Sequence, residues 1–422
     1  MKKFLFVLVA GLALVSCRDK TVNKYMANSP VYTPFEEFRQ TPEFKIAQPL
    51  SSSGNIYFKD DHLFVIEADK GIHFIDNSNP STPINVGFLD VWGCTGMAIR
   101  GDYLYVNSFI DMIIMDVSDL YSPKEVRRLE DVFPFALPVS DANYPVAHID
   151  KTKGVVTSWE VKKVKEEVGT TTNWGGCWNC EMATFDGGAV SLDSYSGNAT
   201  GPQAVGTAGS ISLFTIVENY LYVMSDDRLQ PFNLSDASNP SVEQAVGVWG
   251  DVETLFPYQD YIFMGTPTGM MIYGTDNPSQ PNYISMFSHA RGCDPVVVRD
   301  DVAYVTVRSG GPCGGDINQM DVLNVSDVTN PTLISTVQMK NPHGLGIDGN
   351  MLFVCDGDAG LKVYDATDPS TVGDNMVEKF KNIQATDVIP LGNVAMMIGD
   401  DGIYQYDYSD PNNLVHLSTI PF

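Results

Sequence analysis

A short pattern recurs seven times along the 422-residue chain, and no other feature constrains the fold as much. Each copy has a turn with Asp or Asn, an aliphatic and aromatic strand, and a second polar turn that usually carries Pro. The first two copies are KDDHLFVIEADKGIHFIDNSNPSTP (59–83) and RGDYLYVNSFIDMIIMDVSDLYSP (100–123). The strands after the first turn begin at Leu63, Leu104, Leu221, Ile262, Ala303, Leu352 and Ala395, at intervals of 41, 117, 41, 41, 49 and 43 residues. Self-similarity at about 40 residues indicates a repeat architecture.

The turn that opens each copy has the strictest position. Two residues before each strand start stands Asp or Asn: Asp61, Asp102, Asn219, Asp260, Asp301, Asn350 and Asn393. These residue types tolerate left-handed backbone and hydrogen-bond to amides of their own turn.

Each period also holds four short apolar runs bounded by Gly, Asp, Asn and Pro, which is typical of strands. Four strands in roughly 40–45 residues make one propeller blade. We therefore predict an all-β fold, a single β-propeller of four-stranded blades. Seven blades are expected; eight are the alternative, because 148–168 alternates like a strand pair and could form a degenerate blade. A pair of β-sandwich domains would have no reason to hold one pattern in register seven times.

The repeats resemble a known family. Strings such as LFVIEADKGIHFIDNSNPSTP (63–83) and MLFVCDGDAGLKVYDATDPS (351–370) are similar to LVIVD repeats of bacterial propeller proteins, often of the surface or envelope. The resemblance runs over 54–422 apart from the long second interval. It implies the propeller fold and brings no shared catalytic signature.

The N-terminus predicts export. A charged start, Met1 to Lys3, is followed by an apolar run from Phe4 to Leu14 that is too short to span a bilayer permanently. The ending Leu-Val-Ser-Cys resembles a bacterial lipobox, which implies a signal peptide over 1–17 and a lipid on Cys17; an ordinary signal peptide is the alternative. We expect a lipoprotein of the periplasm or cell surface, with the outer membrane favoured. Residues 18–50 would be a tether and N-terminal packing segment, and 51–422 the propeller.

Charge and cysteine content narrow the partners. The chain has 52 Asp and Glu against 26 Lys and Arg, a net charge of −26, which disfavours nucleic acids and anionic membrane surfaces. Six cysteines besides Cys17 suggest disulfides in an exported protein. Cys177 with Cys180 is predicted as a small staple and Cys293 with Cys313 as a second bridge; Cys355 competes for the latter, and Cys94 could pair with Cys355. No second Cys or His pair accompanies these positions, so we expect no metal and no cofactor.

Propeller topology sorts the loops onto two faces. The Asp/Asn turns and the Asp-x-Ser-Asp-x-Pro turns fall on one, the regular face. The other, the irregular face, carries the turns between second and third strands, the links between blades, an insertion (132–209) and an extended loop (308–319). The insertion holds the candidate lid residues Trp174, Trp178, Phe185 and Tyr195. The residues nine before each strand start should surround the mouth of the central channel: Gly54, Thr95, Ser212, Glu253, Asp294, His343 and Thr386, next to Asp387.

Two functions remain for this arrangement. Irregular loops on a rigid scaffold usually carry binding sites, which favours a non-enzymatic, lipid-anchored binding or scaffold protein. Its ligand would be a glycan, a peptide or a protein partner. The alternative is an envelope polysaccharide hydrolase or lyase that uses Glu253, Asp294 and Asp387 with His343. The polar ring could equally be hydrogen-bonded residues around a water-filled channel. We find no nucleophile elbow, phosphate-binding Gly loop or His-Glu-x-x-His motif, so the binding function is favoured.

Overall fold

The computed structural model describes residues 22–51, 54–167, 207–289, 292, 295–309, 315–381, 383–410 and 413–422. The chain divides into two compact units. The first comprises Met1–Phe38 and Pro138–Leu192, and the second Arg39–Leu137 and Asp193–Phe422. Among the described residues, no helix has the length and apolar character needed to cross a bilayer.

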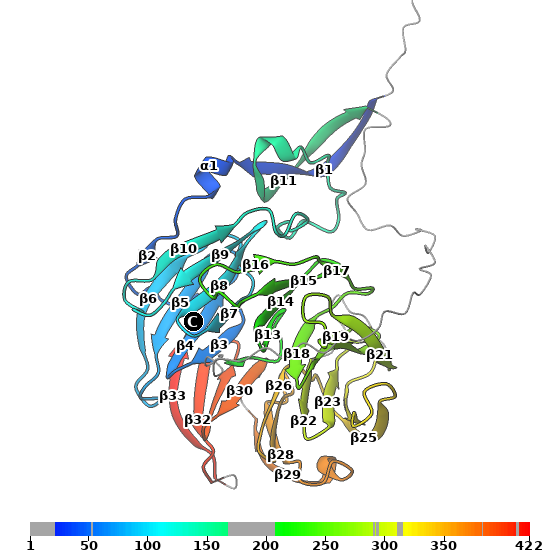
Figure 1. Ribbon diagram of the computed structural model, residues 1–422. Helices are drawn as coiled ribbons and strands as arrows, with labels where there is room; N and C mark the ends of the chain where they lie inside the picture. The colour runs from blue at the N-terminus through cyan, green and yellow to red at the C-terminus, as the bar shows by residue number, and fades with distance from the viewer. Residues whose placement is uncertain are drawn as a thin grey trace, which may run out of the picture. The chain divides into compact units, whose positions relative to one another are not determined.

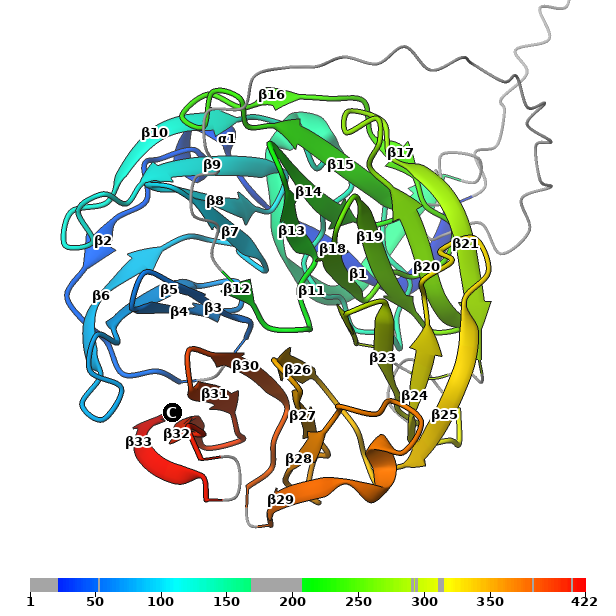
Figure 2. The same ribbon diagram turned by 60° about the horizontal axis from the view of Figure 1, so that its bottom comes forward.

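The second unit is a ring of seven antiparallel blades (Figure 2). Blade 1 has β3 (Ile56–Lys59), β4 (His62–Glu67), β5 (Gly71–Asp76) and β6 (Ile84–Asp90), with β2 (Phe44–Lys45) beside β6 and β12 (Thr207–Ala208) beside β3. Blade 2 has β7 (Met97–Arg100), β8 (Tyr103–Ser108), β9 (Asp111–Asp116) and β10 (Lys124–Leu129). Blade 3 has β13 (Phe214–Val217), β14 (Tyr220–Ser225), β15 (Arg228–Asn233) and a divided outer strand, β16 (Ser241–Val242) and β17 (Val246–Gly247).

The remaining blades follow the same order from the centre outward. Blade 4 has β18 (Thr254–Tyr258), β19 (Tyr261–Thr266), β20 (Gly269–Gly274) and β21 (Asn282–Ser288). Blade 5 has β22 (Val296–Arg299), β23 (Val302–Val307), β24 (Gln319–Asn324) and β25 (Thr332–Gln338). Blade 6 has β26 (Leu345–Asp348), β27 (Met351–Cys355), β28 (Leu361–Asp365) and β29 (Met376–Phe380), with the short helix η3 (Val372–Asp374). Blade 7 has β30 (Asp387–Leu391), β31 (Val394–Ile398), β32 (Gly402–Asp407) and β33 (Val415–Pro421). The predicted seven-bladed, all-β propeller is confirmed.

The first unit is built on a two-stranded antiparallel sheet (Figure 1). Its strands are β1 (Val22–Thr33) and β11 (Val155–Glu167), and it also holds α1 (Phe35–Phe38) and η1 (Lys151–Lys153). The possible eighth blade in 148–168 is therefore wrong, because this segment supplies a single long strand whose partner comes from 22–33. The run Val155–Glu167 contains no Gly, Pro, Asn or Asp with which to turn back on itself.

The Asp/Asn turns and the turns after the third strands share one face. The backbone carbonyl of each turn Asp or Asn accepts a hydrogen bond from the residue that follows the third strand of its own blade: Asn77, Val117, Leu234, Thr275, Val325, Ala366 and Tyr408. Left-handed backbone occurs in every copy at the preceding residue: Asp60, Gly101, Glu218, Gln259, Asp300, Gly349 and Gly392. Of the turn Asp and Asn residues themselves, only Asp61, Asp301 and Asn393 are left-handed.

The ring closes through side chains, because the strands of blade 1 and of blade 7 are each consecutive in sequence. Asn77 Nδ2 donates to Gln405 Oε1 at 2.9 Å, and Gln405 Nε2 donates to Asn77 Oδ1 at 2.7 Å. Both side chains are buried. Ser418 Oγ adds a hydrogen bond of 2.6 Å to the carbonyl of Pro80. Apolar side chains of adjacent blades fill the space between them; one such cluster joins Leu63 and Val65 of blade 1 to Met396 of blade 7.

Candidate functional site

Residues 207–212, here called the return segment, bring the chain back from the insertion across the centre of the ring (Figure 2). β12 pairs with β3, the innermost strand of blade 1, and Gly209 N donates to Ile56 O at 3.2 Å. The chain then reaches blades 6 and 7 through Ser210 before it enters β13 of blade 3. The return segment therefore contacts inner strands that are widely separated in sequence.

Asp387, the first residue of β30, fixes this segment. Its side chain is buried, at 2% exposure, and Oδ1 accepts hydrogen bonds from Ser210 N at 3.2 Å and Ser210 Oγ at 3.0 Å. Ser210 Oγ in turn accepts a hydrogen bond of 2.9 Å from the backbone N of Leu345 in β26. One serine thus links the return segment to two blades.

Two glycines allow this close approach. A Cβ on Gly209 would lie 1.8 Å from Asp387 Oδ2, and a Cβ on Gly344 would lie 2.2 Å from Asp387 Oδ1. Any larger residue at either position would force the carboxylate or the backbone to move.

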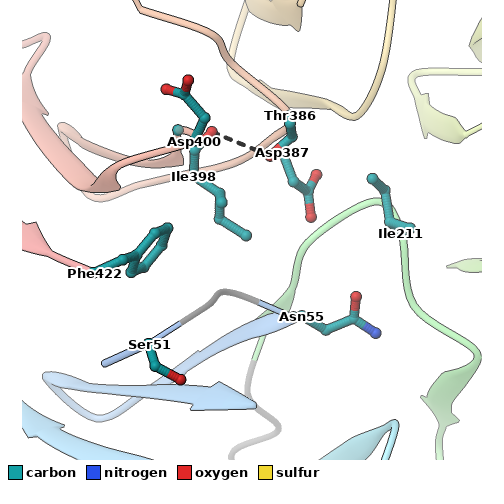
Figure 3. Close-up of a pocket in the computed structure, with 10 residues that line it drawn as sticks. Ser51, Asn55, Ile211, Thr386, Asp387, Ile398, Asp400 and Phe422 are labelled. Carbon is teal, nitrogen blue, oxygen red and sulfur yellow. Dashed lines mark hydrogen bonds between the residues drawn. The ribbon is translucent and has the colours of Figure 1, made fainter. Parts of the chain in front are cut away.

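A pocket of about 480 Å³ opens beside Asp387 (Figure 3). It is lined by Ser51, Gly54, Asn55, Ile211, Thr386, Asp387, Ile398, Gly399, Asp400 and Phe422. These residues come from the start of blade 1, the return segment and blade 7, on the irregular face. Figure 3 shows the Asp387 carboxylate directed into the space between Asn55 and Ile211.

The electrostatics of Asp387 are unusual for an aspartate. Burial raises its pKa to about 6, and the hydrogen bonds from Ser210 oppose that rise only in part. Oδ2 makes no hydrogen bond with the residues that the structure describes. Since a buried charge without a partner is costly, this carboxylate is poised to accept a proton or a donor group.

The described members of the predicted ring at the channel mouth do not all line the same pocket. Thr386 and Asp387 line the pocket together, with Gly54. Thr95 belongs to another pocket, of about 200 Å³, where its backbone N donates to Asn107 Oδ1 at 2.9 Å. Ser212 is buried, and its Oγ donates to the carbonyl of Phe214 at 2.9 Å, so it closes a local turn.

Glu253 and His343 occupy the same register position as Thr386. Their backbone N–H groups donate to Gly265 O at 2.9 Å and Cys355 O at 2.7 Å, as Thr386 N does to Ile398 O at 2.9 Å. Neither lines the Asp387 pocket. Burial, with the nearby charge of Arg308, lowers the pKa of His343 to about 4, so its ring is neutral at pH 7.

Several predicted positions lie outside the described residues. These are Cys17, the lid residues Trp174, Trp178, Phe185 and Tyr195, the ring residue Asp294, and the cysteines 177, 180, 293 and 313. Cys94 and Cys355 are described: both are buried free thiols, so the pairing of these two is wrong. No group of three or more His, Cys, Asp or Glu placed to hold a metal occurs in the part of the chain that the structure describes.

Sequence reasoning missed Ser210, Asn55 and Asp400, and the two glycines that admit the carboxylate. Gly344 directly follows the ring position His343, and Gly209 directly precedes Ser210. For Gly344, the glycine next to a blade-starting position was a signal of close backbone approach that the sequence offered.

The fold defines the protein as a seven-bladed β-propeller with a segment across one mouth. The model of the LVIVD repeat family matches residues 52–91, 94–131 and 343–380, which fall on blades 1, 2 and 6. The chain therefore contains LVIVD repeats within a seven-bladed β-propeller, as its sequence resemblance implied.

Solved structures agree on the fold. The computationally designed Ika8 protein has 10% sequence identity and a TM-score of 0.51, with 89% of this chain and 91% of that chain covered. A protein from Lactobacillus plantarum has 11% identity and a TM-score of 0.50, with 81% and 87% covered. At such identities the likeness concerns the fold alone. None of the curated proteins matches this sequence.

Proposed function

We propose that this chain is a lipid-anchored, non-enzymatic binding protein of the bacterial cell envelope that holds a ligand or protein partner on the irregular face. The pocket beside Asp387 is the observation that carries the proposal. Its volume of about 480 Å³ falls in the range of small-ligand sites. Its walls come from the residues that begin blades and from a turn between a second and a third strand. The amino-acid sequence of a propeller can vary at such positions without disturbing the core.

The insertion supports the choice of face. On its N-terminal side, Phe133 N donates to Ile110 O, in the turn between the second and third strands of blade 2. On its C-terminal side, Gly209 lies against Ile56 at the channel mouth. Both of these ends belong to the irregular face. A long insertion in a compact domain is usually functional. The two ends of this insertion join the propeller beside candidate binding sites.

The anchor and the location rest on the sequence of 1–17. Lipid on Cys17 would hold the propeller at a membrane surface in the periplasm or on the cell surface, with the outer membrane favoured. The partner would be a peptide, a protein or a glycan presented there. Each would meet a rigid scaffold, so loop residues rather than the blades would determine specificity.

Photo-crosslinking in bacterial cells that express the full chain tests the binding face. The photo-reactive p-benzoylphenylalanine would replace Trp92 or Asp400 on the irregular face, and Tyr121 or Asp276 on the regular face. All four side chains are exposed, and each pair matches an aromatic with an aromatic and an acid with an acid. Discrete adducts from the irregular face alone are expected. Adducts that come equally from both faces, or only from the regular face, would contradict the proposal.

The pKa of Asp387 favours one second candidate, the polysaccharide hydrolase or lyase. A carboxyl group with a pKa of about 6 suits a general acid, and Asp400 is the other carboxylate of the pocket. Reducing-sugar or unsaturated-product assays on envelope polysaccharides test this activity. If the native chain turns over a polysaccharide and Asp387→Asn lowers that rate by about 100-fold or more, the enzyme is favoured. Absence of turnover above the blank removes it.

A further inference from the structure

We propose that the Asp387 pocket binds a primary ammonium group, carried by a small amine or by a lysine side chain of a peptide. This inference rests on the proposed binding function and names the chemistry of its ligand. It follows from the charge of the pocket, from the acceptors that remain free in it and from its apolar wall.

The charged residues that line the pocket are both acidic. Its lining includes Asp387 and Asp400 but no Lys, Arg or His. Among the described residues, none forms a salt bridge with Asp387, and only burial and hydrogen bonds shift its pKa. The negative charge on this wall is therefore uncompensated within the described chain, and a cationic ligand would compensate it.

The free acceptors favour an ammonium over a guanidinium group. Oδ1 of Asp387 is already taken by Ser210, which leaves Oδ2 as a single acceptor without a partner. A guanidinium group binds best to both oxygens of a carboxylate at once, and that bidentate face is absent here. An ammonium group needs only separate acceptors around a point charge.

Asn55 supplies a second acceptor. Its Nδ2 is directed to the carbonyl of Thr95 at 3.5 Å, which leaves Oδ1 for the pocket. Figure 3 shows this oxygen on the side of Asn55 that faces Asp387. The hydroxyls of Ser51 and Thr386 are engaged as donors, to Glu67 and to the carbonyl of Ile398.

The apolar part of the lining suits an alkyl chain. Ile211, Ile398 and Phe422 line the pocket together with the acidic and polar groups. An aliphatic amine could therefore place its methylenes against these side chains and its ammonium group between Asp387 and Asn55. A neutral ligand of the same shape would gain the apolar contact but leave the carboxylate unpaired.

Isothermal titration calorimetry on the purified full chain at pH 7.5 tests the site. The probes are 1,5-diaminopentane and the peptide acetyl-Gly-Lys-Gly-amide. Matched controls are the same peptide with an acetylated lysine side chain and acetyl-Gly-Arg-Gly-amide. At least one ammonium probe should bind at least 10-fold more tightly than either control peptide.

Variants assign the contact. Asp387→Asn keeps an acceptor for Ser210 and should weaken binding by about 10-fold or more, as expected for loss of a buried charge partner. Asn55→Leu removes the second acceptor without touching Ser210, so it tests the site even if Asp387→Asn unfolds the return segment; a loss of about 3-fold or more is expected. Asp276→Asn, an exposed acid on the regular face, should bind as the native chain does.

The outcomes separate the possibilities. Binding of diaminopentane alone assigns a small amine, and tighter binding of the lysine peptide assigns a lysine-bearing partner. Equal binding of the ammonium probes and the acetylated control, or unchanged binding by both pocket variants, overturns the inference. If the inference is overturned but photo-crosslinks from the irregular face are observed, only the ammonium site is rejected. If those crosslinks are absent as well, the proposed binding function is also rejected.

Discussion

At the scale of single residues, Gly344 sets how closely blade 6 approaches Asp387. Because a Cβ there would lie 2.2 Å from Asp387 Oδ1 and 2.8 Å from Ser210 Oγ, Gly344→Ala should lower the free energy of unfolding by about 1–3 kcal/mol. Urea denaturation followed by tryptophan fluorescence measures this change. Gly247→Ala is the matched control, since no atom lies within 4 Å of its added Cβ, and it should stay within about 0.5 kcal/mol of the native chain. Equal losses in the two variants would show that the contact at Gly344 is not the cause.

Asp387 also makes stability depend on pH. Its pKa is raised from 3.8 to about 6 in the folded chain, so the folded state holds the proton over a range in which the unfolded chain has released it. The stabilisation is complete below the unfolded pKa and is lost as the pH rises through the folded pKa. Relative to Asp387→Asn, the native chain should therefore lose about 2–3 kcal/mol between pH 4 and pH 7. Urea titrations of both proteins at the two pH values check this, and a difference that does not vary with pH would contradict it.

At the scale of elements, the contact between β32 and the turn after β5 closes the ring. Removing one amide of the Asn77–Gln405 pair leaves the other buried without its partner, so Asn77→Ala and Gln405→Ala should each cost about 1–3 kcal/mol. The double variant should cost less than the sum of the two, because the second substitution removes the orphaned group. A thermodynamic cycle of urea denaturation measures the coupling. Strict additivity would mean that the two amides stabilise the fold independently.

Whether the sequence could predict an element depends on how close together in the chain the residues that form it lie. The turn at Asp61 lies within one blade, and Asp or Asn recurs at its position in every copy, so the pattern alone located it. The pairing of β1 with β11 joins Val22 to Glu167, and nothing in either segment specifies the other. The hydrogen bond between Ser210 and Asp387 spans 177 residues and appears only when the ring closes. Thr386 and Asp387 were named from the sequence and both line the pocket, but the sequence did not indicate the residues that distant segments bring there.

At the scale of the whole molecule, the thiol of Cys17 should determine whether the protein is bound to a membrane. If Cys17 carries the lipid, Cys17→Ser should move the protein from the membrane fraction to the soluble fraction and abolish incorporation of radiolabelled palmitate. Acyl chains supply the binding energy for the membrane, and a strongly acidic protein, with a net charge of −26 over the full sequence, adds no attraction to anionic lipids. Cell fractionation and labelling measure both effects. Continued labelling of the variant, or membrane retention without the thiol, would contradict the anchor.

The way the ring closes has a consequence for how such a protein can change over evolutionary time. Among the described strands, none is shared between the first and last blades, so one stretch of about 40 residues encodes the four strands of one blade. An unequal crossover between two repeats would add or delete a whole blade and leave no strand without its neighbours. The contacts at the seam would have to form again: the Asn77–Gln405 amide pair, the Ser418 hydrogen bond and the apolar cluster. A gene of this kind can alter the circumference of its product in single steps, while the loops of one face diverge separately.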